Sequence, residues 1–330
     1  MRALRVHRHG EPDEALELED VPVPVPEPGQ VTIRVGAAAL GLQDLLLVRG
    51  TYQLKPDLPF TPGLEAAGTV TAVGADVDAA WIGQRVVGVP ALPDGALAEE
   101  AIVPASNLYR LRDDVRDVDA AATHIAFTTA HVALHRRAAL QTGETLLVHA
   151  GAGGTGSAAI QLGVLAGARV IATSGSPERA AICRDLGAEV AIDYRQEDFD
   201  TVVRDLTGDR GADVIFDPVG GAVFHRSRHC IASEGRLLLI GFAAGEPQTI
   251  KANGILLGNY SVMGVYMGAY SRGDANREML RSVHDELLTL LSTGAIHALI
   301  SREVGFRDVA SALGQLRDRE VIGRVVVRPE

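Results

Sequence analysis

The sequence is poor in the residues that build thiolate metal sites and disulfides. Its only cysteines are Cys183 and Cys230, and no Cys-x-x-Cys pair occurs. A zinc site built on thiolates is therefore excluded on ligand count. Because a free cysteine behaves as a small apolar side chain, we expect both to be buried thiols in predicted helices.

The ten histidines include no His-Glu-x-x-His pattern. His131 and His135 lie four residues apart on a predicted helix, a spacing that can hold a metal ion. No carboxylate occupies a suitable neighbouring position, so we expect no metal site.

The chain also lacks an excess of positive charge and a long apolar run. Its net charge of −11 disfavours binding to nucleic acids or membrane surfaces, which requires a basic face. No stretch of about 20 uninterrupted apolar residues occurs, so we expect no membrane span. The first eight residues lack the apolar core of a signal peptide, and we expect a cytoplasmic protein.

A length of 330 residues, 47% of them hydrophobic, predicts two domains. Residues 1–123 are rich in predicted strands, with a proline-rich extended segment at 21–29. Residues 124–264 alternate strands and helices. Residues 265–330 contain helices near 275–293 and 306–316 and a closing strand at 324–328. We expect this strand to return to the first block, because it has no partner in the second.

The second block contains six predicted strands, at 145–149, 169–173, 189–193, 213–217, 236–241 and 261–264. Six strands with intervening helices make a complete doubly wound parallel sheet. The fold class is therefore α/β.

A glycine-rich turn follows the first of these strands and precedes a predicted helix at 157–167. Gly151, Gly153 and Gly156 satisfy G-x-G-x-x-G in the strand–turn–helix context that the motif needs. The first glycine permits the tight turn, the second lets a pyrophosphate approach, and the third lets the helix pack on its strand. With Ala152, Gly154 and Thr155, they predict a dinucleotide site at a helix N-terminus.

The end of the second strand indicates which dinucleotide binds. An NAD site usually places a carboxylate there, to bind the ribose 2′-hydroxyl. This strand instead ends in Thr173-Ser174-Gly175-Ser176, with Arg179 on the next helix and Tyr194 at the end of the third strand. A small polar strand end with a nearby arginine favours NADPH over NADH.

Further stretches carry a resemblance to one family. They are P-D-L-P-F-T-P-G-L-E-A-A-G at 56–68, T-T-A-H-V-A-L at 128–134, I-G-F-A-A-G at 240–245, V-M-G-V-Y-M at 262–267 and G-R-V at 323–325. Together they resemble the medium-chain dehydrogenases/reductases, in the zinc-free NADPH:quinone oxidoreductase branch that includes zeta-crystallin. Leu64 stands where zinc alcohol dehydrogenases of this superfamily have a histidine ligand.

The resemblance implies a GroES-like β-rich catalytic domain (1–123, completed by 265–330) and a Rossmann domain (124–264). It implies a homodimer formed through edge strands of the nucleotide domains. It also implies cofactor contacts at Thr129, Gly241, Phe242, Ala243, Val265, Tyr266, Met267 and Arg324.

The catalytic candidates are Tyr52, Gln43 and Asp44. The family often has Asn-x-x-Asp near the nicotinamide, whereas this chain has Gly41-Leu42-Gln43-Asp44, so Gln43 is the candidate substitute. Tyr52 matches a family tyrosine in the cleft between the blocks, where Thr129 and Tyr266 are also expected; it is otherwise a packing aromatic.

Without zinc to polarise a carbonyl, the substrate should be an acceptor that is already activated, such as a quinone or an enone. The leading function is an NADPH-dependent reductase of such acceptors. An enoyl-thioester reductase is the alternative, and it would need a basic channel to which Arg226, Arg228 and Arg272 are candidates. A third possibility is an NADPH-binding structural protein of zeta-crystallin type, whose RNA-binding version the net charge disfavours.

Overall fold

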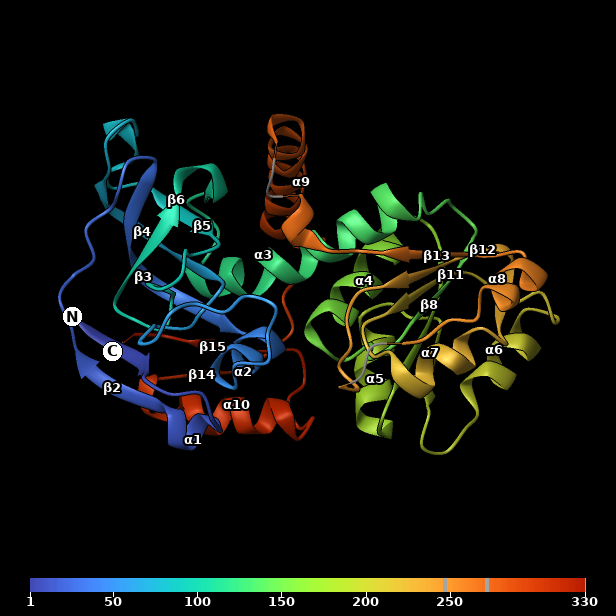
Figure 1. Cartoon of the computed structure of the whole chain (residues 1–330). Coiled ribbons are helices and arrows are strands. Elements are labelled where there is room, and N and C mark those ends of the chain that lie inside the picture. Colours follow the sequence, from blue (N-terminus) through green and yellow to red (C-terminus); the bar gives the residue numbers. More distant parts are fainter. Residues whose placement is uncertain (246–247, 271–272, 330) are drawn as a thin grey trace. The chain divides into compact units, whose positions relative to one another are not determined.

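The computed structural model describes residues 1–245, 248–270 and 273–329, and the chain divides into two compact units. Unit 1 comprises Met1–Ile125 and Ser271–Glu330, and unit 2 comprises Ala126–Tyr270. Figure 1 shows both units with most of their helices and strands labelled. The chain first passes from unit 1 to unit 2 inside one helix, α3 (Asp117–His131), between Ile125 and Ala126, whereas the sequence predicts domain boundaries after residues 123 and 264.

Unit 1 is built on a mixed sheet in which neighbours follow the order β14-β15-β3-β4-β5-β7, with β6 also paired to β3. Its strands are β3 (Gln30–Leu40), β4 (Ala66–Val73), β5 (Arg85–Gly88), β6 (Glu100–Pro104), β7 (Leu108–Arg110), β14 (Ile300–Val304) and β15 (Arg324–Val327). Because β15 pairs antiparallel with β3, the prediction that the closing strand returns to the first block is confirmed. A separate hairpin holds β1 (Arg2–Val6) and β2 (Leu16–Asp20).

Alternate residues of β3 pack into two different cores, as the period of a strand requires. Ala38 and Leu40 belong to one apolar cluster, and Ala37 and Ala39 belong to another. The helices of unit 1 are α1 (Pro12–Ala15), α2 (Leu42–Val48), the first part of α3, α9 (Asp274–Ser292) and α10 (Val309–Arg317), with short 3-10 turns η1 (Ala79–Trp81), η2 (Ala105–Asn107) and η5 (Phe306–Asp308). The predicted helices near 275–293 and 306–316 are thus confirmed.

Unit 2 holds a six-stranded parallel sheet in the order β10-β9-β8-β11-β12-β13. The strands are β8 (Thr145–Val148), β9 (Arg169–Ser174), β10 (Val190–Asp193), β11 (Ala212–Asp217), β12 (Ile231–Leu239) and β13 (Ser261–Gly264). This is the doubly wound order 3-2-1-4-5-6, which confirms the predicted fold class. All six strands end at the same edge of the sheet.

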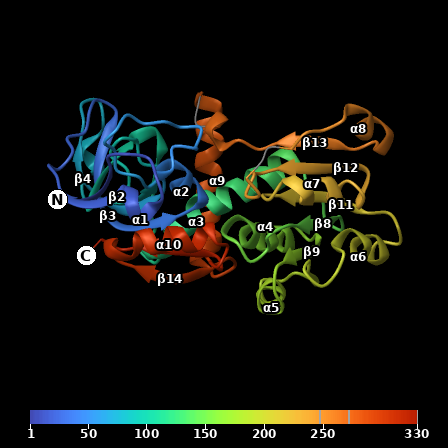
Figure 2. The ribbon, with the colours of Figure 1, turned by 60° about the horizontal axis from the view of Figure 1, so that its bottom comes forward.

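The helices of unit 2 pack around this sheet, as Figures 1 and 2 show. They are α4 (Gly154–Leu165), α5 (Pro177–Asp185), α6 (Phe199–Leu206), α7 (Gly221–Ser227) and α8 (Ala252–Gly258), with the π-helix η3 (Val132–Arg137) and the short turn η4 (Met267–Ala269). Cys183 lies in α5 as predicted. Cys230 does not lie in a helix, because α7 ends at Ser227, but both thiols are buried and free. Among the described residues, no helix is long and apolar enough to cross a membrane.

Candidate cofactor and active site

The glycine turn joins β8 to α4 at the carboxyl edge of the unit 2 sheet. A Cβ built on Gly156 would lie 2.1 Å from the carbonyl oxygen of Ala150, and one on Gly151 would lie 2.8 Å from Cys183 Sγ. Both positions therefore admit only hydrogen. Ala150 itself has a φ of 52°, in the left-handed region that costs a non-glycine residue about 1 kcal/mol or more.

The remaining residues of the turn leave the N-terminus of α4 open. Ala152 is buried, and Gly153, Gly154 and Thr155 are half-buried. Gly153 is the N-cap of α4, and the first turn of this helix contains no acidic residue. The first N–H groups of a 12-residue helix thus face a turn of small side chains, an arrangement that fits a pyrophosphate.

The carboxyl ends of β9 and β10 lie side by side next to this turn. Ser174 pairs in register with Asp193, and a Cβ on Gly175 would lie 2.7 Å from the Tyr194 hydroxyl oxygen and 3.6 Å from Arg195 Nε. The structure therefore brings Tyr194 beside the end of β9, as the NADPH hypothesis requires.

Two residues at this edge were not singled out by the sequence analysis. Arg195 adds a second cation near the end of β9; the only signal for it was its position directly after Tyr194. Asp193 adds a buried carboxylate, whose Oδ1 accepts the amide N–H of Arg195 at 3.1 Å. The ends of β9 and β10 thus carry one carboxylate, that of Asp193, beside several hydrogen-bond donors.

Arg179 lies in the first turn of α5. Its amide N–H donates to the hydroxyl oxygen of Ser176, which caps this helix, at 3.2 Å. The hydroxyl of Ser174 donates to the carbonyl oxygen of Ser176 at 3.4 Å. Ser174 and Arg179 therefore both hydrogen-bond to Ser176, and both lie at the carboxyl edge of the sheet.

The other predicted cofactor residues of unit 2 lie mostly in segments that follow strands. Gly241, Phe242 and Ala243 follow β12, and Val265, Tyr266 and Met267 follow β13. The amide of Ala243 donates to the carbonyl oxygen of Pro218, and that of Val265 to Leu239, so both segments are tied to the sheet edge. Thr129 is buried in α3. In an open α/β sheet, ligands bind at this edge.

Gln43 lies in the first turn of α2, in unit 1. Its amide group folds back against Gly41, since a Cβ there would lie 2.5 Å from Gln43 Nε2. Among the described residues, this buried Nε2 has no hydrogen-bond partner. Buried donors are nearly always paired, so this donor is an exception in the described part of the chain.

Tyr52 follows α2 and is half-buried against the larger apolar cluster of unit 1. Its amide donates to the carbonyl oxygen of Leu46 at 3.1 Å, which fixes the backbone here. The ring thus packs, as one of the two interpretations of the sequence expects. A catalytic role for the hydroxyl stays a prediction.

Asp44 is completely buried, and both of its oxygens accept hydrogen bonds. Oδ2 accepts the amide of Gly41 at 2.8 Å, and Oδ1 accepts that of Leu64 at 3.2 Å. Burial raises the pKa of this carboxyl to about 6, against the attraction of Arg324. The geometry favours an anchor for the start of α2 over the catalytic role suggested by the sequence.

Arg324 opens β15 and is buried in an ion pair with Glu65, a partner that the sequence analysis did not identify. The other oxygen of Glu65 accepts the amide of Ile125, inside α3. Burial raises the pKa of Glu65 to about 7, opposed by Arg324. Arg324 Nε has no partner among the described residues, so the predicted cofactor contact of this residue stays open.

Because of Glu65, we expect the free energy of unfolding to fall as the pH rises from about 4.5 to about 7. In this window the folded protein keeps a proton that the unfolded chain, with the usual pKa of 4.5, has released. The folded state then binds more protons, so stability falls with rising pH, by at most about 1.4 kcal/mol per pH unit. Urea unfolding of wild type and Glu65→Gln between pH 4.5 and 8 isolates this slope.

The comparison with Glu65→Gln is needed because other groups act in the opposite sense. His124 and His149 are buried with pKa values of about 3, so they add stability as the pH rises from about 3 to 6.5. A wild-type stability that rises relative to Glu65→Gln over the window would contradict the prediction.

The donor set gives little support to a zinc site. Leu64, which the resemblance matches to the zinc histidine of related enzymes, is buried. Burial raises the pKa of Cys183 to about 11 and of Cys230 to about 12, so both are thiols at neutral pH, whereas a cysteine binds zinc as the thiolate. Of the described residues, one trio could approach a metal ion: the exposed His7 and Glu17 and the half-buried Glu19, around the β1–β2 hairpin.

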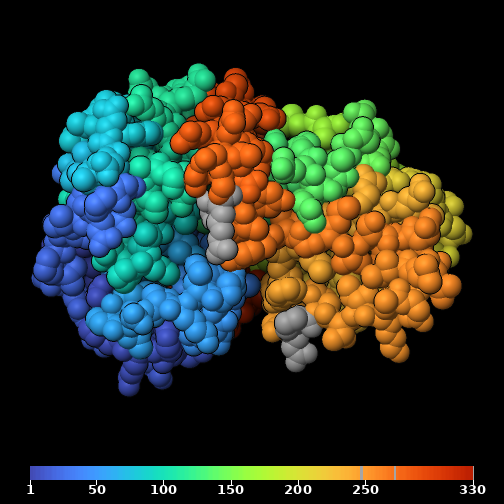
Figure 3. Space-filling view, turned by 45° about the horizontal axis from the view of Figure 1, so that its top comes forward, coloured from blue at the N-terminus to red at the C-terminus, as the bar shows by residue number. Residues whose placement is uncertain are grey.

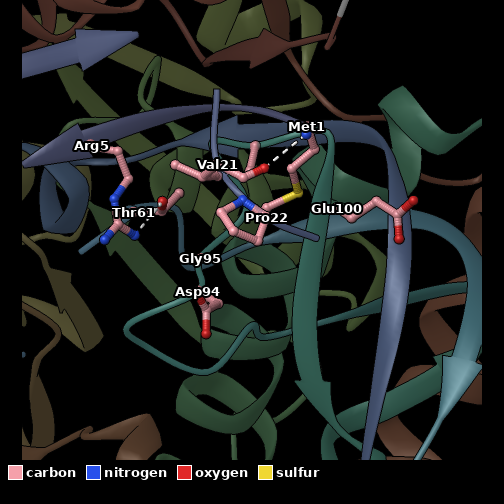
Figure 4. Close-up of a pocket in the computed structure, with 9 residues that line it drawn as sticks. Met1, Arg5, Val21, Pro22, Thr61, Asp94, Gly95 and Glu100 are labelled. Carbon is pink, nitrogen blue, oxygen red and sulfur yellow. Dashed lines mark hydrogen bonds between the residues drawn. The ribbon is translucent and has the colours of Figure 1, made fainter. Parts of the chain in front are cut away.

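A small cavity in unit 1 contains none of the predicted site residues (Figure 4). It has a volume of about 190 Å³, and Arg5, Asp94 and Glu100 lie in its wall, with Arg5 donating to the Thr61 hydroxyl oxygen at 3.3 Å. Ligand pockets usually measure roughly 300–1,000 Å³. The cavity is therefore not assigned to the substrate.

Each unit contains a stretch that matches a known protein family. Residues 27–113 match the alcohol dehydrogenase GroES-like domain, and residues 154–285 match the zinc-binding dehydrogenase family.

Three relatives illustrate the similarity. The quinone oxidoreductase-like protein 2 homolog of Nematostella vectensis is 37% identical over 300 residues, 90% of this chain and 81% of that protein. A mycobacterial protein solved in complex with NADPH is 32% identical over the whole of both chains, with a TM-score of 0.92. Escherichia coli quinone oxidoreductase, also complexed with NADPH, is 27% identical over both whole chains, with a TM-score of 0.92.

Proposed function

The chain belongs to the medium-chain dehydrogenase/reductase superfamily, among its quinone oxidoreductase-like proteins, and from this membership we propose its reaction. The protein uses NADPH to reduce a quinone, or a related conjugated carbonyl compound, without zinc. The observation that carries this proposal is the glycine turn, where Gly151 and Gly156 admit no side chain and no side chain caps the start of α4.

The residues divide the work between binding and charge stabilisation. When bound, NADPH supplies the hydride that the acceptor takes up. The turn between β8 and α4 binds the pyrophosphate, and Ser174, Arg179 and Tyr194, with Arg195, bind the 2′-phosphate. The orphan donor of Gln43, or the Tyr52 hydroxyl, donates to the acceptor oxygen as negative charge builds there. The proton then comes from solvent or from Tyr52.

The enoyl-thioester alternative is weaker than the quinone proposal. Its basic channel needs free arginines, but Arg226 is ion-paired with Asp198 and Asp200, and Arg228 donates to the Tyr260 hydroxyl. Arg272 lies outside the described residues. No observation favours a purely structural NADPH-binding protein.

One screen separates these functions. NADPH consumption is followed at a single protein concentration with a quinone, an enone and an enoyl-CoA as acceptors. Turnover of the quinone or the enone supports the proposal, and turnover of the enoyl-CoA alone would replace it with the thioester function. NADPH binding without turnover of any acceptor would favour a binding protein.

We expect NADPH to bind at least tenfold more tightly than NADH, because donors outnumber acids at the ends of β9 and β10. Arg179→Ala should weaken NADPH by about 1–3 kcal/mol, the scale of a charged hydrogen bond, and leave NADH nearly unchanged. Isothermal titration of both dinucleotides measures this. Equal affinity of the wild-type protein for both would contradict it.

We also propose that two copies of the chain form a dimer through unit 2. β13 is the edge strand of its sheet, so one row of its backbone groups is open to pairing. The preceding helix, α8, exposes Leu256 and Leu257, at 78% and 82%. Figure 3 shows this part of the sequence in orange on the surface of unit 2. A monomeric mass in light scattering would contradict this proposal.

A further inference from the structure

His149 directly follows β8, two residues before Gly151 of the glycine turn, and the reaction proposed above gives it no role. Its side chain is 1% exposed and lies edge-on to Phe199, with ring centroids 4.8 Å apart. Its amide donates to the carbonyl oxygen of Phe216 on the neighbouring strand at 3.0 Å. The residue before the left-handed Ala150 is therefore fixed in both its backbone and its ring.

Both ring nitrogens of His149 are hydrogen-bonded. Nδ1 lies 3.0 Å from the Thr173 hydroxyl oxygen, and Nε2 lies 2.8 Å from the Ser227 hydroxyl oxygen. Thr173 belongs to β9 and Ser227 ends α7, so one side chain joins three elements of unit 2.

The direction of these bonds follows from the hydroxyl of Ser227. It donates its single proton to the carbonyl oxygen of Val223 at 2.8 Å, so toward His149 it can only accept. Nε2 therefore carries the proton of the imidazole, and Nδ1 accepts from the Thr173 hydroxyl. Burial lowers the pKa of the ring to about 3, so the imidazole is neutral near pH 7.

Thr173 connects this chain of bonds to both predicted phosphate sites. Its carbonyl oxygen accepts the amide of Gly151 in the glycine turn at 2.9 Å. The next residue is Ser174, at the predicted 2′-phosphate site. Through Thr173, the ring of His149 thus fixes the turn on one side and the end of β9 on the other.

We propose that His149 is a positioning residue whose bonds to Thr173 and Ser227 set the glycine turn and Ser174 at the spacing that NADPH requires. This inference rests on the proposed function, because it concerns the cofactor of that reaction. It goes beyond it by assigning dinucleotide selectivity to a residue that cannot touch the 2′-phosphate.

Thr173→Val tests the proposal with the smallest change, because it keeps the shape of the side chain and removes only the bond to Nδ1. The backbone N–H groups of the turn serve NADPH and NADH equally, whereas Ser174 serves only the 2′-phosphate. A loosened turn weakens both dinucleotides and a displaced Ser174 weakens only NADPH, so we expect the Kd for NADPH to rise about tenfold and that for NADH to rise by a smaller factor. His149→Phe should weaken both, and NADPH more.

Thr145→Val is the matched control. Thr145 is a buried threonine at the opposite end of β8, where its hydroxyl oxygen accepts from Arg210 at 3.3 Å. Thr145→Val should lower the melting temperature and leave the ratio of the Kd values for NADPH and NADH unchanged. Hydrogen exchange of residues 149–156 in the unliganded protein should quicken in Thr173→Val and stay as in wild type in Thr145→Val.

The outcomes distinguish this inference from the proposed function. If wild-type protein binds neither dinucleotide in isothermal titration, the proposed function fails and the inference with it. If wild type prefers NADPH and Thr173→Val keeps the same preference, only the role of His149 is overturned. A lower melting temperature with an unchanged ratio likewise shows a purely structural histidine.

Discussion

Arg324→Met should destabilise the protein by about 3–5 kcal/mol at pH 8, the cost of leaving a buried charge without its partner. The side chains of Arg324 and Glu65 are 8% and 0% exposed, and Asp44 adds a second buried carboxylate to the same field. Without the guanidinium, Glu65 takes up a proton, and the neutral carboxyl group avoids the cost of an unpaired buried charge. The loss should therefore shrink toward pH 5, which urea unfolding at both pH values would show.

Two further variants make this expectation specific. Glu65→Gln with Arg324→Met removes both charges and should recover most of the loss, because a neutral pair needs no counter-charge. Arg2→Met breaks a half-exposed pair with Glu99 and should cost about 1 kcal/mol or less. An Arg324→Met loss no larger than that of Arg2→Met would show that the buried pair contributes nothing.

The same double variant decides between two roles of Arg324. The resemblance assigns it to the cofactor, whereas the structure pairs it with Glu65 and leaves Nε without a partner among the described residues. If Arg324 only anchors, NADPH affinity should return in the double variant together with stability. If Nε or its neighbours contact the cofactor, affinity should stay low although stability recovers.

The parallel sheet of unit 2 was predictable because its central strands are apolar runs followed by glycine turns. The limits of β12 were less so: it begins at Ile231, not at the predicted 236. Residues 231–235 include Ser233, Glu234 and Gly235, which read as a loop; in the structure they hold an irregular register with β11, and Glu234 has a φ of 63°. Polar residues in a bulged strand give no periodic signal.

In the candidate site, features set by neighbouring residues were predictable from the sequence, and features set by residues far apart in the chain were not. The glycine turn was predictable because its requirements lie within six residues of sequence. The pairing of Glu65 with Arg324 was not, because the two residues are 259 positions apart and meet only when β15 joins β3. The orphan amide of Gln43 was equally hidden, since whether a buried donor finds a partner depends on packing and not on residue type.

Tyr52→Phe is expected to lower kcat and kcat/KM together, by about 100-fold or more with an enone acceptor. The substitution keeps the ring, which packs against the core of unit 1, and removes only the hydroxyl. A hydrogen bond made only as charge builds on the acceptor oxygen affects both constants equally. With a quinone the effect should be smaller, because this acceptor needs less stabilisation of its oxyanion.

The kinetic pattern separates the possible roles of Tyr52. A rise in KM alone would mean that the hydroxyl binds ground state and transition state equally. Tyr260→Phe is the matched control: its hydroxyl accepts from Arg228 Nε at 3.1 Å in unit 2, so its loss should affect stability and not turnover. If Tyr52→Phe leaves the kinetics of both acceptors unchanged, Tyr52 only packs. The oxyanion would then depend on the orphan amide of Gln43, and Gln43→Leu should show the loss that Tyr52→Phe did not.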